Sequence, residues 1–134
     1  MRQPRQLDQA TKTISASAHQ GLTELMSALR STLLHDRELA GLVVRTRAGL
    51  EGLDEIDQYR FGLVAGLVFR LFDNIHQQHK LGLLTESQWE NWALLLKQNL
   101  ASLGFRAYWA ENASYYSEGF RAEVAELLAA EVAP

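Results

Sequence analysis

The sequence predicts an all-α fold, a single-domain bundle of about five to six helices with a central helix near residues 54–80. Three observations support this prediction. Between Pro4 and Pro134 the chain has no proline, the residue that most strongly interrupts helices. Apolar residues recur every three or four positions, which is the period of a helix. The chain contains neither sustained apolar–polar alternation nor an Asn-Gly or Asp-Gly pair, which are the patterns that predict β-strands and hairpins.

The first helix is predicted from about Leu7 to His35. Its apolar stripe consists of residues three or four apart, namely Leu7, Thr11, Ile14, Ala18, Leu22, Leu25, Leu29 and Leu33. Before Gly21 the stripe is thin, so we divide the chain into an N-terminal helical extension (1–20) and a bundle domain (21–134). The extension either frays or needs a partner that covers Ile14.

The second and third helices are each preceded by an aspartate that can cap them. Asp36 precedes a short helix that ends near Arg47, and Asp54 precedes the central helix, which ends near Lys80 before Gly82. The central helix is apolar on one face through Ile56, Tyr59, Leu63 and Leu67, and on another through Phe61, Val64, Val68, Phe72 and Ile75. Because both faces are apolar, we expect this helix to be enclosed by its neighbours.

The remaining chain is predicted to form three more helices. Thr85 and Gln88 fit a capping box for a helix that runs to about Leu103 and is ended by Gly104. A short helix then runs from Phe105 to about Asn112 and, after a cap at Ser117, a last helix runs to about Ala130. We expect Trp89, Trp92 and Trp109 to be buried against the central helix, and the pair Tyr115-Tyr116 to be partly exposed.

Composition excludes several functional classes. The 134 residues include no cysteine, which excludes disulfides, thiolate metal sites and a cysteine nucleophile. The net charge of −3 gives no basic field for nucleic acid, so no nucleic-acid partner is expected. The sequence contains no P-loop, dinucleotide glycine motif, serine elbow or HExxH motif. We therefore predict no cofactor, no catalytic residues and no enzyme activity.

Asp73, His76 and His79 are spaced three residues apart on the predicted central helix and would face roughly one side of it. Carboxylate and imidazole are ligands of divalent metals, so these residues are a candidate metal site. The alternative is structural. Asp73 would pair with His76 at the solvated end of the helix. There, positively charged histidines would interact favourably with the negative end of the helix dipole.

Arg70 lies within the apolar part of the central helix, and a charge there needs a partner or a route to water. One hypothesis is an anionic or aromatic ligand held between helices by a set of cationic and aromatic residues, namely Arg60, Arg70, Arg106, Trp89, Trp92 and Trp109. The alternative is that the arginines form internal ion pairs or extend to solvent.

From about Leu53 to Leu128 the chain carries four aromatic or glycine-containing motifs: Tyr59-Arg60-Phe61, Lys80 to Leu84 followed by Trp89 and Trp92, Phe105 to Trp109, and Phe120. In these motifs it resembles a loose group of uncharacterised small bacterial all-helical proteins. The resemblance implies the helical fold and implies no activity for any residue. Members of that group often carry an N-terminal membrane anchor, and this sequence contains none.

The preferred functional hypothesis is a non-enzymatic helical interaction domain that self-associates. Two copies would pair through Ile14, Leu22, Leu25 and Leu29 of the first helix. The alternatives are a small-molecule sensor with its ligand between helices, and an inhibitor or adaptor that docks on a larger protein. We expect a soluble, cytoplasmic protein; a place at the membrane surface would require an anchor that this chain lacks.

Overall fold

The computed structural model describes residues 4–132. The first three residues of the predicted extension and the last two of the predicted bundle domain therefore lie outside the described range. In chain order the elements are α1 (Pro4–His35), α2 (Arg37–Arg45), the 3₁₀ turn η1 (Thr46–Ala48), α3 (Glu55–Lys80), α4 (Glu86–Leu100), α5 (Leu103–Asn112), the 3₁₀ turn η2 (Ala113–Tyr115) and α6 (Glu118–Val132). Residues 4–132 thus hold six α-helices and no β-strand, which confirms the all-α prediction.

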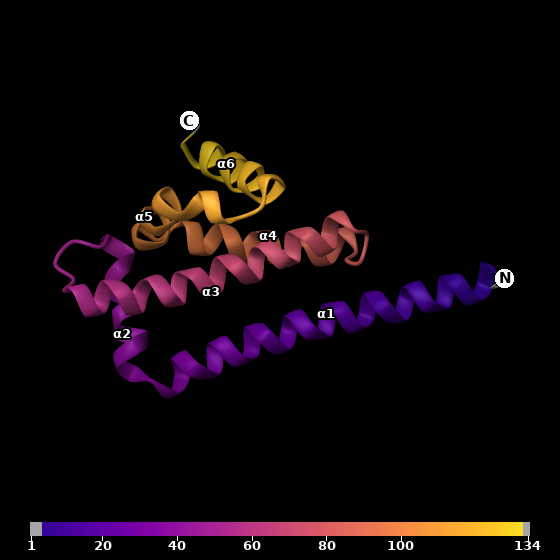
Figure 1. Ribbon diagram of the computed structural model, residues 1–134, viewed down its shortest axis with the longest axis horizontal. Helices are drawn as coiled ribbons and strands as arrows, with labels where there is room; N and C mark the ends of the chain where they lie inside the picture. The colour runs from indigo at the N-terminus through magenta and orange to yellow at the C-terminus, as the bar shows by residue number, and fades with distance from the viewer. Residues whose placement is uncertain (1–3, 133–134) are drawn as a thin grey trace.

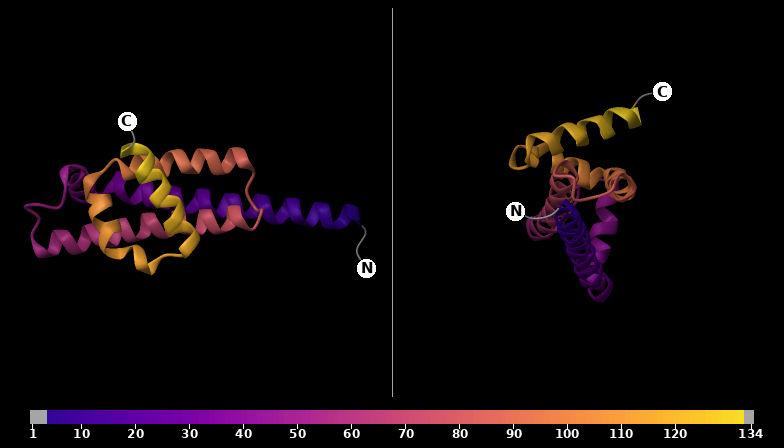
Figure 2. Two further views of the ribbon diagram at one scale, coloured as in Figure 1. Left: turned by 90° about the horizontal axis from the view of Figure 1, so that it is seen from above. Right: turned by 90° about the vertical axis from the view of Figure 1, so that its right-hand side faces the viewer.

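Helix α3 is the axis of the molecule and contacts α1, α2, α4, α5 and α6. Helix α1 runs along one side of α3, and α4, α5 and α6 lie on the other (Figure 1). The N-terminal part of α1 extends past the end of the body formed by the other helices, and α6 crosses obliquely over α3 and α4 (Figure 2). None of the helices within residues 4–132 is long and apolar enough to cross a membrane.

Three predicted helix starts, at Asp36, Asp54 and Thr85, are confirmed by single hydrogen bonds. The carboxylates of Asp36 and Asp54 each accept a bond from the backbone N–H three residues later, at 3.0 and 2.7 Å. Thr85 and Gln88 form the reciprocal capping box at 3.1 and 2.9 Å. At the other end of α3, Gly82 adopts the left-handed conformation, with φ of 76°, that favours glycine after a helix.

The prediction that one helix runs to Leu103 and stops at Gly104 is wrong. Helix α4 ends at Leu100, and the hydroxyl of Ser102 caps the separate helix α5, which contains Gly104. A Cβ atom on Gly104 would lie 2.5 Å from the carbonyl oxygen of Thr46. The glycine is therefore required for close packing of α5 on η1 and does not end a helix.

The inner side of α3 is packed with aromatic rings centred on Phe69, which is fully buried. Its ring centroid lies within 6.2 Å of four others, those of Phe105, Tyr108, Trp109 and Tyr116. The Tyr116 hydroxyl shares a 2.8 Å hydrogen bond with the Tyr108 hydroxyl, and burial raises the pKa of the Tyr116 phenol. The expectation of a partly exposed tyrosine pair thus holds for Tyr115 and is wrong for Tyr116.

The expectation that α3 is enclosed on every side is also wrong. The face through Phe61, Val64, Val68, Phe72 and Ile75 is buried as predicted. The opposite face, through Ile56, Tyr59, Leu63 and Leu67, is exposed. Since α4, α5 and α6 pack on the inner side and α1 and α2 cover one flank, the described residues leave this second face exposed.

Candidate interaction surface

The exposed face of α3 is an apolar stripe that we call the outer stripe: Ile56, Tyr59, Leu63 and Leu67. Its members are spaced three or four residues apart, so they line one side of the helix. They are between 53% and 71% exposed, although each is a large apolar or aromatic side chain. Scattered apolar residues on a surface are ordinary, whereas four in a row on one helix face mark a candidate contact site.

The same side of α3 changes character one turn after Leu67. The residues that continue the line of the outer stripe toward the C-terminus are Arg70, Asn74 and Gln77, and all three are exposed and polar. A helix face that only meets water is expected to be polar along its whole length. The apolar part of this exposed face is therefore confined to the segment from Ile56 to Leu67, where it forms one continuous patch.

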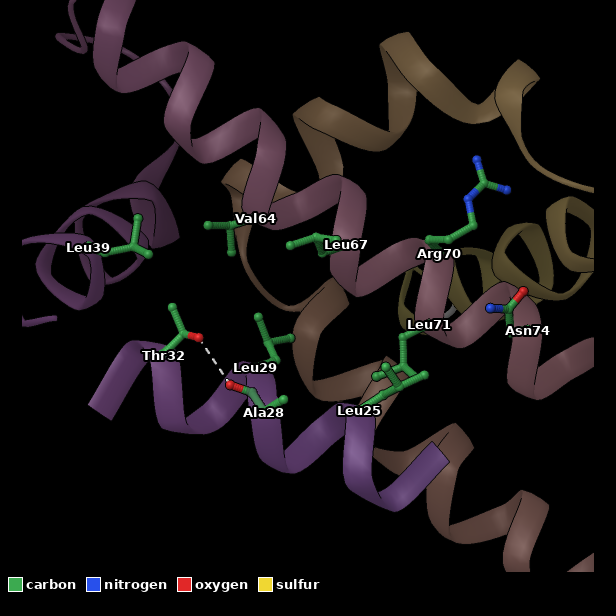
Figure 3. Close-up of a pocket in the computed structure, with 10 residues that line it drawn as sticks. All are labelled: Leu25, Ala28, Leu29, Thr32, Leu39, Val64, Leu67, Arg70, Leu71 and Asn74. Atoms are coloured by element: carbon green, nitrogen blue, oxygen red, sulfur yellow. Dashed lines mark hydrogen bonds between the residues drawn. The ribbon is translucent and has the colours of Figure 1, made fainter. Parts of the chain in front are cut away.

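A groove between α1, α2 and α3 adjoins the outer stripe and has a volume of about 440 Å³ (Figure 3). Its walls are Leu25, Ala28, Leu29 and Thr32 of α1, Leu39 of α2, and Val64, Leu67, Arg70, Leu71 and Asn74 of α3. Seven of these ten residues are Ala, Val or Leu. Leu67 belongs to both features, so the groove and the outer stripe form one surface, which we call the interaction surface.

Helix α1 is held on the body by a short part of its length. Of its described side chains only Leu22 is buried, while Met26 and Leu29 are partly buried against the core. The His19 ring meets the edge of Trp92, and the Ser15 hydroxyl donates to the carbonyl oxygen of Leu83. A second recess of about 240 Å³ lies on the α4 side of α1. With open space on both sides, α1 packs less tightly than the helices on the inner side of α3.

The four residues predicted as an interface on α1 divide between two roles. Leu22 is buried against the chain's own core, so its placement in an interface between copies is wrong. Leu29 is partly buried against that core and also lines the groove. Leu25 lines the groove as well, while Ile14 lies one residue before Ser15, the residue that bonds to Leu83, and both Leu25 and Ile14 are more than half exposed.

The three candidate arginines do not meet in one site. Arg60 forms ion pairs with Glu38 at 2.7 Å and Asp36 at 3.9 Å, which join α3 to α2. Arg70 lies 3.7 Å from the Asp73 carboxylate and 4.5 Å from the centre of the Tyr116 ring. Its guanidinium points away from the floor of the groove in Figure 3.

Arg106 donates through Nε to the carbonyl oxygen of Leu100 at the end of α4. Each of the three arginines thus has a structural contact on a different element. The alternative interpretation, that they act in packing and ion pairing, accounts for Arg60 and Arg70 directly.

The three tryptophans are core residues, as expected. Trp92 and Trp109 are buried, and Trp89 is partly buried against the core. They pack on α3, where Trp92 meets Phe72, Trp109 meets Phe69, and Trp89 lies between His76 and His79. None of the three lines the groove of the interaction surface. The structure therefore separates the tryptophans from the groove that Arg70 borders.

The candidate metal residues are turned toward different partners. Asp73 accepts bonds from the Ser117 hydroxyl at 2.7 Å and the Ser117 backbone N–H at 3.0 Å. His79 stacks on Trp89 and lies 2.9 Å from the Glu86 carboxylate. The part of the chain that the structure describes contains no group of three His, Cys, Asp or Glu side chains that could hold a metal ion. Asp73 therefore pairs with Ser117, and not with His76 as the structural alternative predicted.

His76 is buried between Trp89 of α4 and Phe120 of α6. Within the described chain its Nδ1 atom has no hydrogen-bond partner. Burial lowers the pKa of His76, and the charges of Lys80 and His79 lower it further while Asp73 opposes the shift. A buried ring with apolar neighbours and a lowered pKa is neutral at pH 7, which suits a packing role.

Comparisons with protein-family models, curated proteins and solved structures find no match to this chain. The resemblance to small bacterial helical proteins therefore stays a prediction.

Sequence reasoning found the members of the outer stripe and assigned them to the interior. The signal that marks them as exposed was present in the sequence. Along their line, Arg70, Asn74 and Gln77 replace the apolar residues, whereas the buried line through Val64 and Val68 stays apolar as far as Ile75.

Proposed function

We propose that this chain is a non-enzymatic helical interaction domain that forms a homodimer through the interaction surface. The observation that carries the proposal is the outer stripe, where four large apolar side chains stand exposed in a line that turns polar at Arg70. Covering them would contribute about 1–2 kcal/mol for each side chain. The absence of cysteine is compatible with a reducing compartment, which supports a cytoplasmic location as part of the proposal.

The composition of the interaction surface favours a second copy over an unrelated partner. Interfaces between identical subunits are more apolar than those between proteins that also exist apart. The groove and the outer stripe supply such an apolar centre, and Tyr59 adds an exposed aromatic residue of the type that often dominates binding energy. Arg60, with Glu38 and Asp36, forms a polar border on the α2 side.

The experiment compares two exposed leucines by sedimentation velocity. Leu63→Glu places a charge in the outer stripe, and Leu94→Glu places the same charge on α4, where the leucine is 63% exposed and outside the interaction surface. We expect the unchanged chain and Leu94→Glu to be dimers and Leu63→Glu to be a monomer. A buried charge at an apolar interface weakens association by tenfold or more, roughly 1.4 kcal/mol or above.

Two results of that experiment contradict the proposal. One is an unchanged chain that stays a monomer at every concentration. The other is equal dimerisation of both variants. Since both leucines are more than half exposed, neither substitution is expected to disturb the fold. Circular dichroism of the two variants provides the control.

The groove supports a second candidate function, the binding of a small apolar molecule. Its volume of about 440 Å³ falls within the range of ordinary ligand pockets, and most of its lining is aliphatic. Native mass spectrometry of the purified chain tests this directly. A monomer that retains an extra mass favours the ligand, and a dimer without extra mass favours self-association.

A further inference from the structure

The N-terminal half of α1, residues 5–20, is here called the arm. Its first part extends past the body (Figure 1), while Ser15 and His19 contact Leu83 and Trp92 of the same chain. Over residues 5–14 of the arm, every side chain except Ala10 is exposed. Leu7 and Ile14 are both more than half exposed. With Thr11 and Ala18 they line one side of the helix, at spacings of four, three and four residues. Leu7, Thr11 and Ile14 are exposed and Ala18 is half-buried, so most of this narrow line is open to solvent in the described chain.

We propose that the arm of one copy docks along the outer stripe of a second copy, with the two helices parallel. This inference rests on the proposed self-association and names the segment that occupies the interaction surface. The two apolar lines match in length. Leu7 to Ala18 and Ile56 to Leu67 each span eleven residue steps, or about 16 Å of helix. Small side chains at Thr11 and Ala18 allow the helices to approach closely.

Charge complementarity selects the parallel direction. The segment 51–57 next to the outer stripe contains four acidic residues and no basic one, and Glu51 and Glu55 are exposed. The arm carries Arg5, Asp8 and Lys12, and Lys12 pairs with Asp8 at 3.4 Å, which leaves Arg5 as the net positive charge near its N-terminus. In the parallel alignment, with Leu7 opposite Ile56, Arg5 falls opposite Asp54 and next to Glu55 of the partner copy. In the antiparallel alignment Arg5 would lie beside Arg70, which is a repulsive pair.

The positions of the two elements allow a closed dimer. The arm lies at one end of the long axis of the molecule, and the start of α3 lies at the other (Figure 1). A two-fold axis perpendicular to the long axis therefore brings each arm to the outer stripe of the opposite copy. Both contacts form at once and are identical, so assembly stops at two chains.

Disulfide trapping tests whether the arm occupies the outer stripe. The chain has no cysteine, so introduced thiols are the only ones present. The Ile14→Cys chain is mixed with a differently tagged Leu63→Cys chain, and in the control with a tagged Leu94→Cys chain. The subunits of each mixture are allowed to exchange between dimers, and the mixture is then oxidised. All three positions are exposed. We expect the Ile14–Leu63 mixture to give at least about tenfold more mixed disulfide than the control, since proximity drives the reaction.

A second pair of mixtures tests the direction. Leu7→Cys is combined with Ile56→Cys or with Leu67→Cys, at the two ends of the outer stripe. The parallel arrangement predicts a mixed disulfide mainly with position 56. A mixed disulfide mainly with position 67 would overturn the parallel arrangement.

The mass of each variant under reducing conditions separates this inference from the proposal on which it rests. Dimers that give no mixed disulfide between arm and outer stripe, or that link two arms through position 14, overturn the docked arm and leave self-association standing. Monomers under all conditions overturn both. A monomer with a retained small molecule overturns both as well and favours the ligand in the groove.

Discussion

The two faces of α3 have opposite surroundings although both are apolar. The inner face packs against α4, α5 and α6 through interlocked aromatic rings, with Phe69 at their centre. The outer face carries Ile56, Tyr59, Leu63 and Leu67 in the open, beside a groove over which α1 packs loosely. Apolar periodicity thus indicates which side of a helix avoids water. It does not report whether the covering surface belongs to the same chain.

The comparison assigns fold stability to the inner face and association to the outer face. Three changes test this division through the free energy of unfolding, measured by urea denaturation at low protein concentration, where a dimer is dissociated. They are ordered by expected effect.

The largest effect is expected from Phe69→Ala. The ring is fully buried and contacts four other aromatic rings, so its removal leaves a cavity in the centre of the core. We expect a loss of about 3–5 kcal/mol in the free energy of unfolding. The matched change on the outer face is Leu67→Ala, for which we expect less than about 1 kcal/mol. Similar losses for the two variants would break the comparison.

A smaller effect is expected from Gly104→Ala. The new methyl group would lie 2.5 Å from the Thr46 carbonyl oxygen, so α5 and η1 must move apart. We expect a loss of about 1–3 kcal/mol. Gly41→Ala is the control, because its Cβ atom meets nothing within 4 Å and alanine favours the helix by about 0.5–1 kcal/mol. An unchanged free energy of unfolding for Gly104→Ala would show that the contact between α5 and η1 adjusts freely.

The smallest effect concerns pH and His76. The folded pKa of His76 lies below the unfolded value of 6.5, because the ring is buried between Trp89 and Phe120. The unfolded chain therefore binds the proton more readily. Stability from the neutral ring is complete above pH 6.5 and is lost as the pH falls from 6.5 toward the lower folded pKa.

Denaturation series at pH 7.5 and 5.5, values chosen to bracket the histidine pKa at about 6.5, measure this loss. His76→Gln cannot titrate and should remove the part of the pH dependence that His76 supplies. His35→Gln changes an exposed histidine and should retain it. Equal pH dependence in the two variants would contradict a neutral, buried His76.

Local chemistry explains what could be predicted from the sequence. Asp36, Asp54 and Thr85 mark helix starts because their side chains satisfy nearby backbone N–H groups, and this requires no knowledge of distant residues. Gly104 misled the prediction because its role depends on Thr46, which lies 58 positions earlier and was not identifiable as a neighbour.

The outer stripe shows the corresponding limit for the site. A helix that is apolar on two sides is expected to make two contacts. From the sequence we predicted that both contacts lie within the same chain. Leu22, placed at an interface, is buried in the core, and Leu63, placed in the core, is exposed. Apolar periodicity alone cannot resolve such exchanges, because inner and outer contacts require the same residue types at the same spacing. For the outer stripe, the additional signal is that its line turns polar at Arg70.

The most direct test of the central claim is the mass of the unchanged chain by sedimentation equilibrium over a wide range of concentrations. The outer stripe and groove predict a reversible shift from the 15.1 kDa monomer to twice that mass as concentration rises. A mass of 15.1 kDa at every concentration would contradict self-association through this surface.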